Sequence, residues 1–108
     1  MNFQDIFNEL KDNIVTLAKI SFKKFADQAA QDGKQLLEDL KDRLQRWTEL
    51  LAQGQITPGD FEMLVLNQKD LIEMAALRQA GLSAIKAEQF RDSIINVVID
   101  TITNVVGI

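Results

Sequence analysis

Three acidic residues near the middle of the chain, Glu38, Asp39 and Asp42, are candidates for acid-base chemistry. Neighbouring carboxylates can act as a general acid and a general base when they are held at a reacting bond. Here Asp39 and Asp42 each precede an arginine by four residues, the spacing at which opposite charges pair on a helix surface. We therefore interpret these carboxylates as part of a solvated helix face and not as a catalytic pair.

The residue types that the chain lacks restrict its chemistry further. The sequence contains no histidine, no cysteine and no tyrosine. Imidazole and thiolate metal ligands, thiol nucleophiles and the commonest general base are therefore missing. We predict that the protein is not an enzyme and that it uses no metal and no other cofactor.

One cluster of basic residues combines positive charge with aromatic rings. Lys19, Lys23 and Lys24 alternate with Phe22 and Phe25. The simpler interpretation is a solvated helix face beside an apolar stripe, and the alternative is a small contact site for an anion. The whole chain has 12 basic and 16 acidic residues and a net charge of −4, which argues against a nucleic acid partner.

A short stretch near the middle of the chain combines the signals that end one helix and begin another. Gly54 suits the left-handed position that follows a helix C-terminus. Thr57 is placed as an N-cap, with Pro58 at the first helical position and Asp60 as the acidic half of a capping box.

Two apolar residues flank the same junction. Ile56 and Phe61 occupy the positions of a hydrophobic staple, which fixes the angle at which the chain enters the second helix. Glycines also precede a helix in phosphate-binding loops, but no Lys-Ser or Lys-Thr follows Gly59 here. We therefore predict a helical hairpin that reverses at residues 54–58.

The first arm of this hairpin carries an apolar stripe from Phe3 to Leu51, with steps of three and four residues throughout. Asp32 and Gly33 interrupt it. Asp32 fits an N-cap with Gln35 completing a capping box, which would begin a new helix. Because the stripe keeps its phase, we favour a continuous or merely kinked helix, in which Gly33→Ala would stabilise the protein by roughly 0.5 to 1 kcal/mol.

In the second arm, the apolar pattern predicts a helix from Pro58 to about Ala80. Gly81, Leu82 and Ser83 then provide a C′ glycine, an apolar C″ residue and a serine N-cap, which favour a break. If the chain reverses at 54–58, residue i lies roughly opposite residue 112 minus i, so Gly33 and Gly81 lie at the same level. Two straight arms would each be ~75 Å long, whereas breaks at that level would give a compact four-helix bundle.

Residues 94–106 form the most apolar stretch of the chain. The run is rich in β-branched residues, but its apolar doublets do not alternate as in a strand, so we predict a helix. Its polar residues recur every three or four positions, which leaves about two thirds of the helix circumference apolar. A single antiparallel neighbour would leave part of this surface exposed, whereas two neighbours in a compact four-helix monomer would cover the rest, which is the competing outcome.

An exposed apolar surface of this size predicts an interface, most simply that of a twofold homodimer. We expect this interface to involve the C-terminal helix and the phenylalanine-rich first helix through eight residues: Phe3, Phe7, Leu10, Ile14, Ile95, Ile99, Ile102 and Val106.

Together these patterns predict an all-α protein, an antiparallel helical bundle of three to four helical segments in a single domain over residues 1–108. The expected function is that of a non-catalytic structural or protein-interaction module that self-associates through its C-terminal helix. The alternative is a peripheral membrane or lipid-binding protein, although Asp92 and Asp100 lie where such helices usually carry lysine and arginine. The first residues lack the pattern of a signal peptide, so we expect a cytoplasmic protein.

Overall fold

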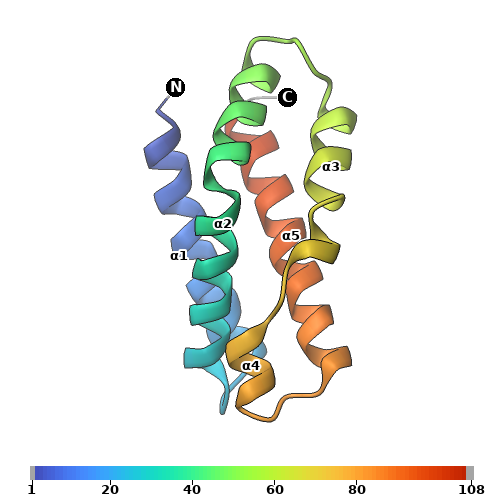
Figure 1. The fold of residues 1–108 in the computed structure, drawn as a ribbon. Helices are drawn as coiled ribbons and strands as arrows, with labels where there is room; N and C mark the ends of the chain where they lie inside the picture. The colour runs from blue at the N-terminus through green and yellow to red at the C-terminus, as the bar shows by residue number, and fades with distance from the viewer. Residues whose placement is uncertain (1, 107–108) are drawn as a thin grey trace.

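The computed structural model describes residues 2–106, and these residues form helices and connections with no β-strand (Figure 1). The elements in chain order are α1 (Phe3–Ser21), α2 (Ala26–Ala52), α3 (Pro58–Leu66), the 3-10 helix η1 (Lys69–Leu71), α4 (Ala75–Gln79) and α5 (Ala84–Val106). α1, α2 and α5 run the length of the molecule, and α3, η1 and α4 together make the remaining corner. The predicted all-α antiparallel bundle is confirmed, and its extents of 43 × 24 × 19 Å exclude the two long straight arms.

The predicted reversal between α2 and α3 is present. Gly54 has a φ of 72°, and the backbone N–H of Gln55 donates to the Leu50 carbonyl at 2.9 Å, which closes the end of α2. The Thr57 Oγ1 accepts from the Asp60 N–H at 3.1 Å, while an Asp60 carboxylate oxygen accepts from the Thr57 N–H at 3.0 Å. Both hydrogen bonds of the predicted capping box are therefore formed.

The first arm breaks between Ser21 and Ala26, where the sequence contains no helix-breaking residue, so the prediction of a continuous helix is wrong. α1 ends at Ser21, and Phe22 is extended with φ −136° and ψ 135°. The ring of Phe22 packs against Phe90 of α5, with a centroid separation of 5.2 Å. This long-range contact accompanies a change of direction that lays α1 antiparallel against α2 (Figure 1).

Gly33 lies in the interior of α2 and does not break it. A Cβ atom at this position would overlap Cγ2 of Ile14, a buried residue of α1. The glycine is therefore needed for the close approach of two helices, which the sequence pattern alone did not indicate.

The second arm is also more divided than predicted. One helix from Pro58 to Ala80 is wrong, because α3 ends at Leu66 and α4 begins only at Ala75. The break at Gly81 is confirmed. This residue has a φ of 104°, and the Leu82 N–H donates to the Leu77 carbonyl at 3.0 Å, as in the predicted glycine cap.

Asp32 holds the short helix α4 in place from α2. Its two carboxylate oxygens accept from the N–H groups of Ala76 and Leu77 at 2.9 and 2.8 Å. Neither Asp32 nor Gln35 begins a new helix, because both lie inside α2. The side chain of Asp32 is only 6% exposed, so it satisfies the first turn of α4 from within the core.

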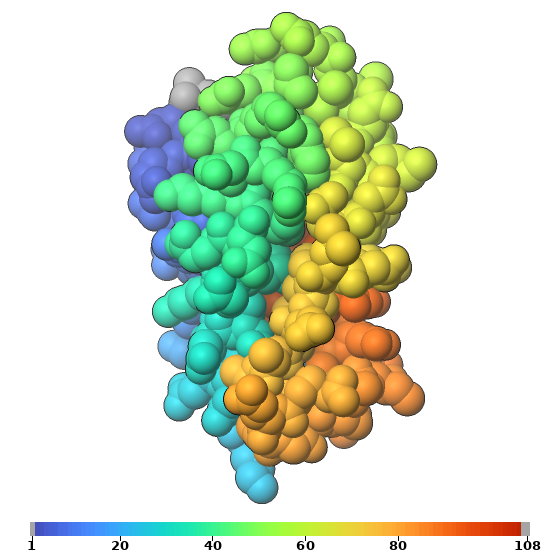
Figure 2. Space-filling view, in the orientation of Figure 1, coloured from blue at the N-terminus to red at the C-terminus, as the bar shows by residue number. Residues whose placement is uncertain are grey.

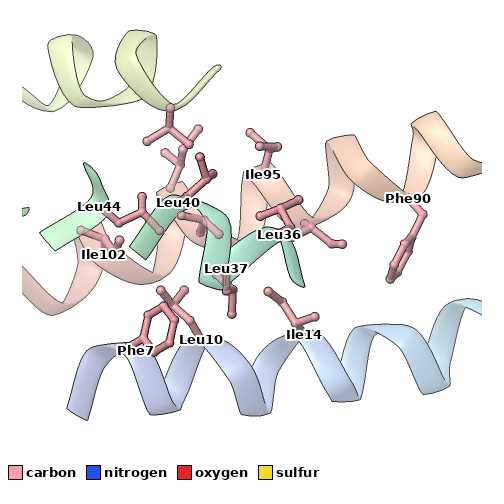
Figure 3. Close-up of a cluster of buried hydrophobic side chains, with 14 of the residues drawn as sticks. Phe7, Leu10, Ile14, Leu36, Leu37, Leu40, Leu44, Phe90, Ile95 and Ile102 are labelled. Atoms are coloured by element: carbon pink, nitrogen blue, oxygen red, sulfur yellow. The ribbon is translucent and has the colours of Figure 1, made fainter. Parts of the chain in front are cut away.

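The eight residues that the sequence assigned to an intermolecular interface lie mostly inside the single chain. Seven are buried in the core, namely Phe3, Phe7, Leu10, Ile14, Ile95, Ile99 and Ile102, and Val106 is partly buried. Figure 3 shows Phe7, Leu10 and Ile14 of α1 pointing toward the leucines of α2 and the isoleucines of α5. Figure 2 shows α2 and the segment around residues 67–74 covering the red C-terminal part of α5 on the face in view, while the orange first part of α5 stays visible.

The physical reason for this correction is the number of neighbours that α5 has. It contacts α1, α2, α3, η1 and α4, whereas the prediction rested on a single antiparallel neighbour. The apolar surface that was expected to need a second chain is therefore covered by the protein's own helices.

Candidate binding site

The connection between α1 and α2 faces the first half of α5 across a surface hollow of about 490 Å³. We call it the basic–aromatic hollow. Its lining consists of an apolar group, Phe22, Phe25, Leu82 and Phe90, a basic group, Lys23, Lys24 and Lys86, and a polar group, Ser21, Gln89 and Ser93. The break after Ser21 creates this site, because an unbroken helix would carry residues 22–25 past α5.

Aromatic and aliphatic side chains form the base of the hollow. Phe90 and Leu82 are only 3% and 8% exposed, so they belong to the core as well as to the site. Phe22 meets Phe90 edge to face, and Phe25 meets Phe22 in the same way at 6.5 Å between centroids. Figure 3 shows Phe90 extending from α5 toward the α1 ribbon, at the opposite end of the core cluster from Phe7.

Three lysines surround this apolar base. Lys23 and Lys24 come from the connection and Lys86 from the first turn of α5, and all three are exposed. Among residues 2–106 the ion pairs are Lys11–Glu38 and Arg91–Asp92, so no lysine of the hollow is paired with a carboxylate. Lys24 instead lies over the ring of Phe25, with its Nζ 5.9 Å from the centroid.

The polar group adds hydrogen-bonding capacity without negative charge. The Ser93 hydroxyl donates to the Gln89 carbonyl at 3.0 Å, which leaves its oxygen free to accept. The hollow thus offers ammonium groups, an amide and hydroxyls around aromatic rings, and its lining includes no carboxylate. Such a surface can attract an anion and can cover an apolar group next to it.

The sequence identified four of the ten residues that line this site. Phe22, Lys23, Lys24 and Phe25 line the hollow, whereas Lys19 of the same predicted cluster does not. The sequence did not identify Lys86, Phe90 and Leu82, because the residues around them form no basic or aromatic cluster. The hairpin register was the one signal that could have found them, since it places Phe22 opposite residue 90.

The acidic cluster behaves as the solvated face that the sequence predicted, but with different partners. Glu38 pairs with Lys11 of α1 at 3.1 Å, and Asp39 accepts from the amide of Gln35 at 2.9 Å. Arg43 donates to Gln68 at 3.1 Å, so the expected Asp39–Arg43 pair is absent. Glu38 thus reaches across to α1, whereas the contact of Asp39 stays within α2, so the carboxylates do not share a partner.

Two other hollows differ from the basic–aromatic hollow in charge and shape. One of about 460 Å³ lies beside α4 and mixes acidic residues such as Glu73 and Glu88 with Arg78 and Arg91. The other, of about 320 Å³, is a groove between α1 and α5 that is lined by Leu17, Ile20 and Val97 together with polar residues. Neither combines a single sign of charge with aromatic rings.

Within the described part of the chain, no helix combines the length and the apolar character needed to cross a membrane. The same residues contain no cluster of three or more carboxylates suited to a metal ion. Comparisons with protein-family models, with curated proteins and with solved structures find no match to this chain.

Proposed function

We propose that this protein is a non-catalytic helical binding module and that the basic–aromatic hollow is its binding surface. The observation that carries this proposal is the grouping of three unpaired lysines around partly exposed phenylalanine rings. The chain as a whole is acidic, with 16 acidic against 12 basic residues. Lysines are the only charged residues that line the hollow, so its local charge is opposite in sign to the net charge of the protein. This local positive charge favours an anionic partner.

The exposure of the lysines favours binding over catalysis. A lysine becomes a nucleophile or a general base when a desolvated site lowers its pKa. Lys23, Lys24 and Lys86 are all solvent-exposed, so none of them lies in such a desolvated site. Their contribution is then electrostatic attraction and hydrogen bonding to an anion.

The sequence predicts self-association through the C-terminal helix because α5 would need a second chain to cover it. This reason no longer applies, because α5 is covered within one chain. Among residues 2–106, the large apolar side chains that remain exposed are Ile20, Met63, Leu71, Ile85 and Val105, which come from four different elements. Single exposed apolar residues are normal on soluble monomers. We therefore propose that the module acts as a single chain.

Binding of the dye anilinonaphthalene sulfonate, which joins aromatic rings to one sulfonate, tests the proposed function. We expect saturable binding at low salt, weakened at least about tenfold when Lys23, Lys24 and Lys86 are all replaced by glutamine. A matched variant with glutamine at Lys19, Lys34 and Lys69 removes the same amount of charge outside the hollow and should bind as the unmodified protein does.

Thermal melts of both variants must show the same folded state, because this dye also binds partly unfolded proteins. Absence of dye binding, or equal weakening by the two triple variants, would overturn the proposed function.

A further inference from the structure

The basic–aromatic hollow does not end at Ser21. The residue before it, Ile20, and Val97, one helical turn beyond Ser93, line the adjoining groove between α1 and α5. From Lys86 to Val97 the path along α5 covers about 16 Å at ~1.5 Å per residue. Hollow and groove thus form an elongated surface that is basic at one end, and its middle combines the apolar residues Phe22, Ile20 and Val97 with the two serines Ser21 and Ser93.

The groove contains the most exposed large apolar side chain of the described residues. Ile20 is 78% exposed, and Leu17 and Val97 beside it are partly buried. The far end of the groove is polar and includes Asp100, together with Asn13 and Thr101, which are joined by a hydrogen bond of 3.3 Å. A negatively charged group is therefore attracted to the lysine end and repelled from the Asp100 end.

Side chains, and not the helix terminus, supply the positive charge at the lysine end. The N–H of Lys86 in the first turn of α5 donates to the Ser83 hydroxyl at 3.3 Å, so this part of the helix terminus is already satisfied. The lysines come from both sides of the hollow, two from the α1–α2 connection and one from α5. An anion between them can accept charge-assisted hydrogen bonds from both elements.

We propose that hollow and groove together bind one single-chain amphiphile with an anionic head group. The head lies at Lys23, Lys24 and Lys86, and the apolar chain lies over Phe22 and extends along the groove past Ile20. This inference rests on the proposed binding function and specifies the ligand class for the same site. The concave shape of the hollow favours a single amphiphile over the flat surface of a membrane.

The first test is displacement of bound anilinonaphthalene sulfonate by dodecanoate below its micelle concentration. We expect dodecanoate to displace the dye, whereas butyrate, which has the head group without the chain, and dodecyltrimethylammonium, which has the chain with the opposite charge, should not. If the dye binds but dodecanoate fails to displace it, or butyrate displaces it equally well, the ligand class is wrong and the proposed binding function still stands. If the dye itself does not bind, the proposed function fails first.

Ile20→Ser tests the path of the chain. Because Ile20 is exposed, the variant should fold normally, yet its affinity for dodecanoate should fall by roughly 3- to 10-fold with the affinity for the dye unchanged. Met63→Ser changes another exposed apolar residue, on α3, and should leave both affinities unaltered. Equal losses in the two variants would contradict the proposed path.

A vesicle experiment separates a free amphiphile from a membrane surface. We expect the protein to remain in solution with phosphatidylcholine vesicles that contain phosphatidylserine. Cosedimentation with these vesicles, together with no binding of free dodecanoate, would overturn the inference in favour of a membrane-docking face.

Discussion

A buried carboxylate links two helices that are far apart in the sequence, and its removal tests how α4 is stabilised. Asp32→Ala would leave the N–H groups of Ala76 and Leu77 without partners in a mostly buried setting. We expect a loss of about 2 to 3 kcal/mol in the free energy of unfolding, because unsatisfied polar groups retain the full cost of desolvation. Urea unfolding curves would measure it.

Asp39→Ala is the matched control, since Asp39 lies exposed on the same helix. Hydrogen exchange at Ala76 and Leu77 adds a local readout, and these amides should exchange faster only in the Asp32 variant. Equal unfolding free energies for the two variants would show that the carboxylate does not stabilise α4.

Gly33 gives opposite expectations from sequence and from structure, so its replacement is informative. The sequence alone predicts that Gly33→Ala stabilises a helix interior. The structure reverses the sign, because the new Cβ would overlap Cγ2 of the β-branched and fully buried Ile14. We expect destabilisation of about 1 to 3 kcal/mol, as for other overpacked cores.

A double-mutant cycle with Ile14→Ala isolates the overlap. Ile14→Ala alone should destabilise by leaving a cavity, and adding Gly33→Ala to it should cost less than Gly33→Ala costs in the unmodified protein. Thermal or urea unfolding of the four proteins measures this coupling. Additive losses would mean that the two helices shift apart without resistance.

At the scale of elements, local signals were predictable and long-range ones were not. The α2–α3 turn was predicted residue by residue, because Gly54, Thr57, Pro58 and Asp60 act on their own neighbours. The α1–α2 break has no glycine or proline, and the apolar stripe continues through it in phase. The contact of Phe22 with Phe90, 68 positions away, is invisible to any pattern within a short window.

The same distinction applies to the candidate site. Its two lysines and two phenylalanines from one segment were recognised together from the sequence. Lys86, Leu82 and Phe90 join them only because the chain folds back twice. The division of the predicted helix from Pro58 to Ala80 into α3, η1 and α4 was also missed. The first turn of α4 depends on hydrogen bonds to a carboxylate of α2, which is distant in the sequence.

The capping box at the α2–α3 turn predicts a dependence of stability on pH. The hydrogen bond from the Thr57 backbone, and then that from the Thr57 side chain, lower the pKa of Asp60 below its ordinary value of 3.8. A carboxylate with a depressed pKa in the folded state stabilises the protein above the unfolded pKa and loses this contribution as the pH falls through the folded pKa. The stabilisation from Asp60 should therefore be complete near neutral pH and disappear in acid below pH 3.8.

Comparison of the unmodified protein with Asp60→Asn across this acidic range checks the sign. The difference in unfolding free energy between the two proteins should shrink as the pH falls. Glu62→Gln, an exposed change in the same helix, should show no such trend. A constant difference between unmodified protein and Asp60→Asn would mean that the carboxylate charge contributes nothing at this turn.

At the scale of the whole molecule, the coverage of α5 decides whether a second chain is needed. From the sequence, Ile99 is expected to lie in an exposed interface, so that a charge there would separate a dimer and leave each chain folded. In the structure Ile99 is 7% exposed and belongs to the core. A lysine at this position must either bury its ammonium group or displace its neighbours, and both cost free energy.

We therefore expect Ile99→Lys to lower the free energy of unfolding by about 2 to 4 kcal/mol without changing the mass in solution. Asn96→Lys, on the exposed side of the same helix, should leave stability nearly unchanged. Light scattering of the unmodified protein at tens of micromolar should give the mass of one chain, 12.2 kDa. A mass of two chains that Ile99→Lys halves without loss of stability would restore the dimer, because it would require a face of α5 that the single-chain packing leaves open.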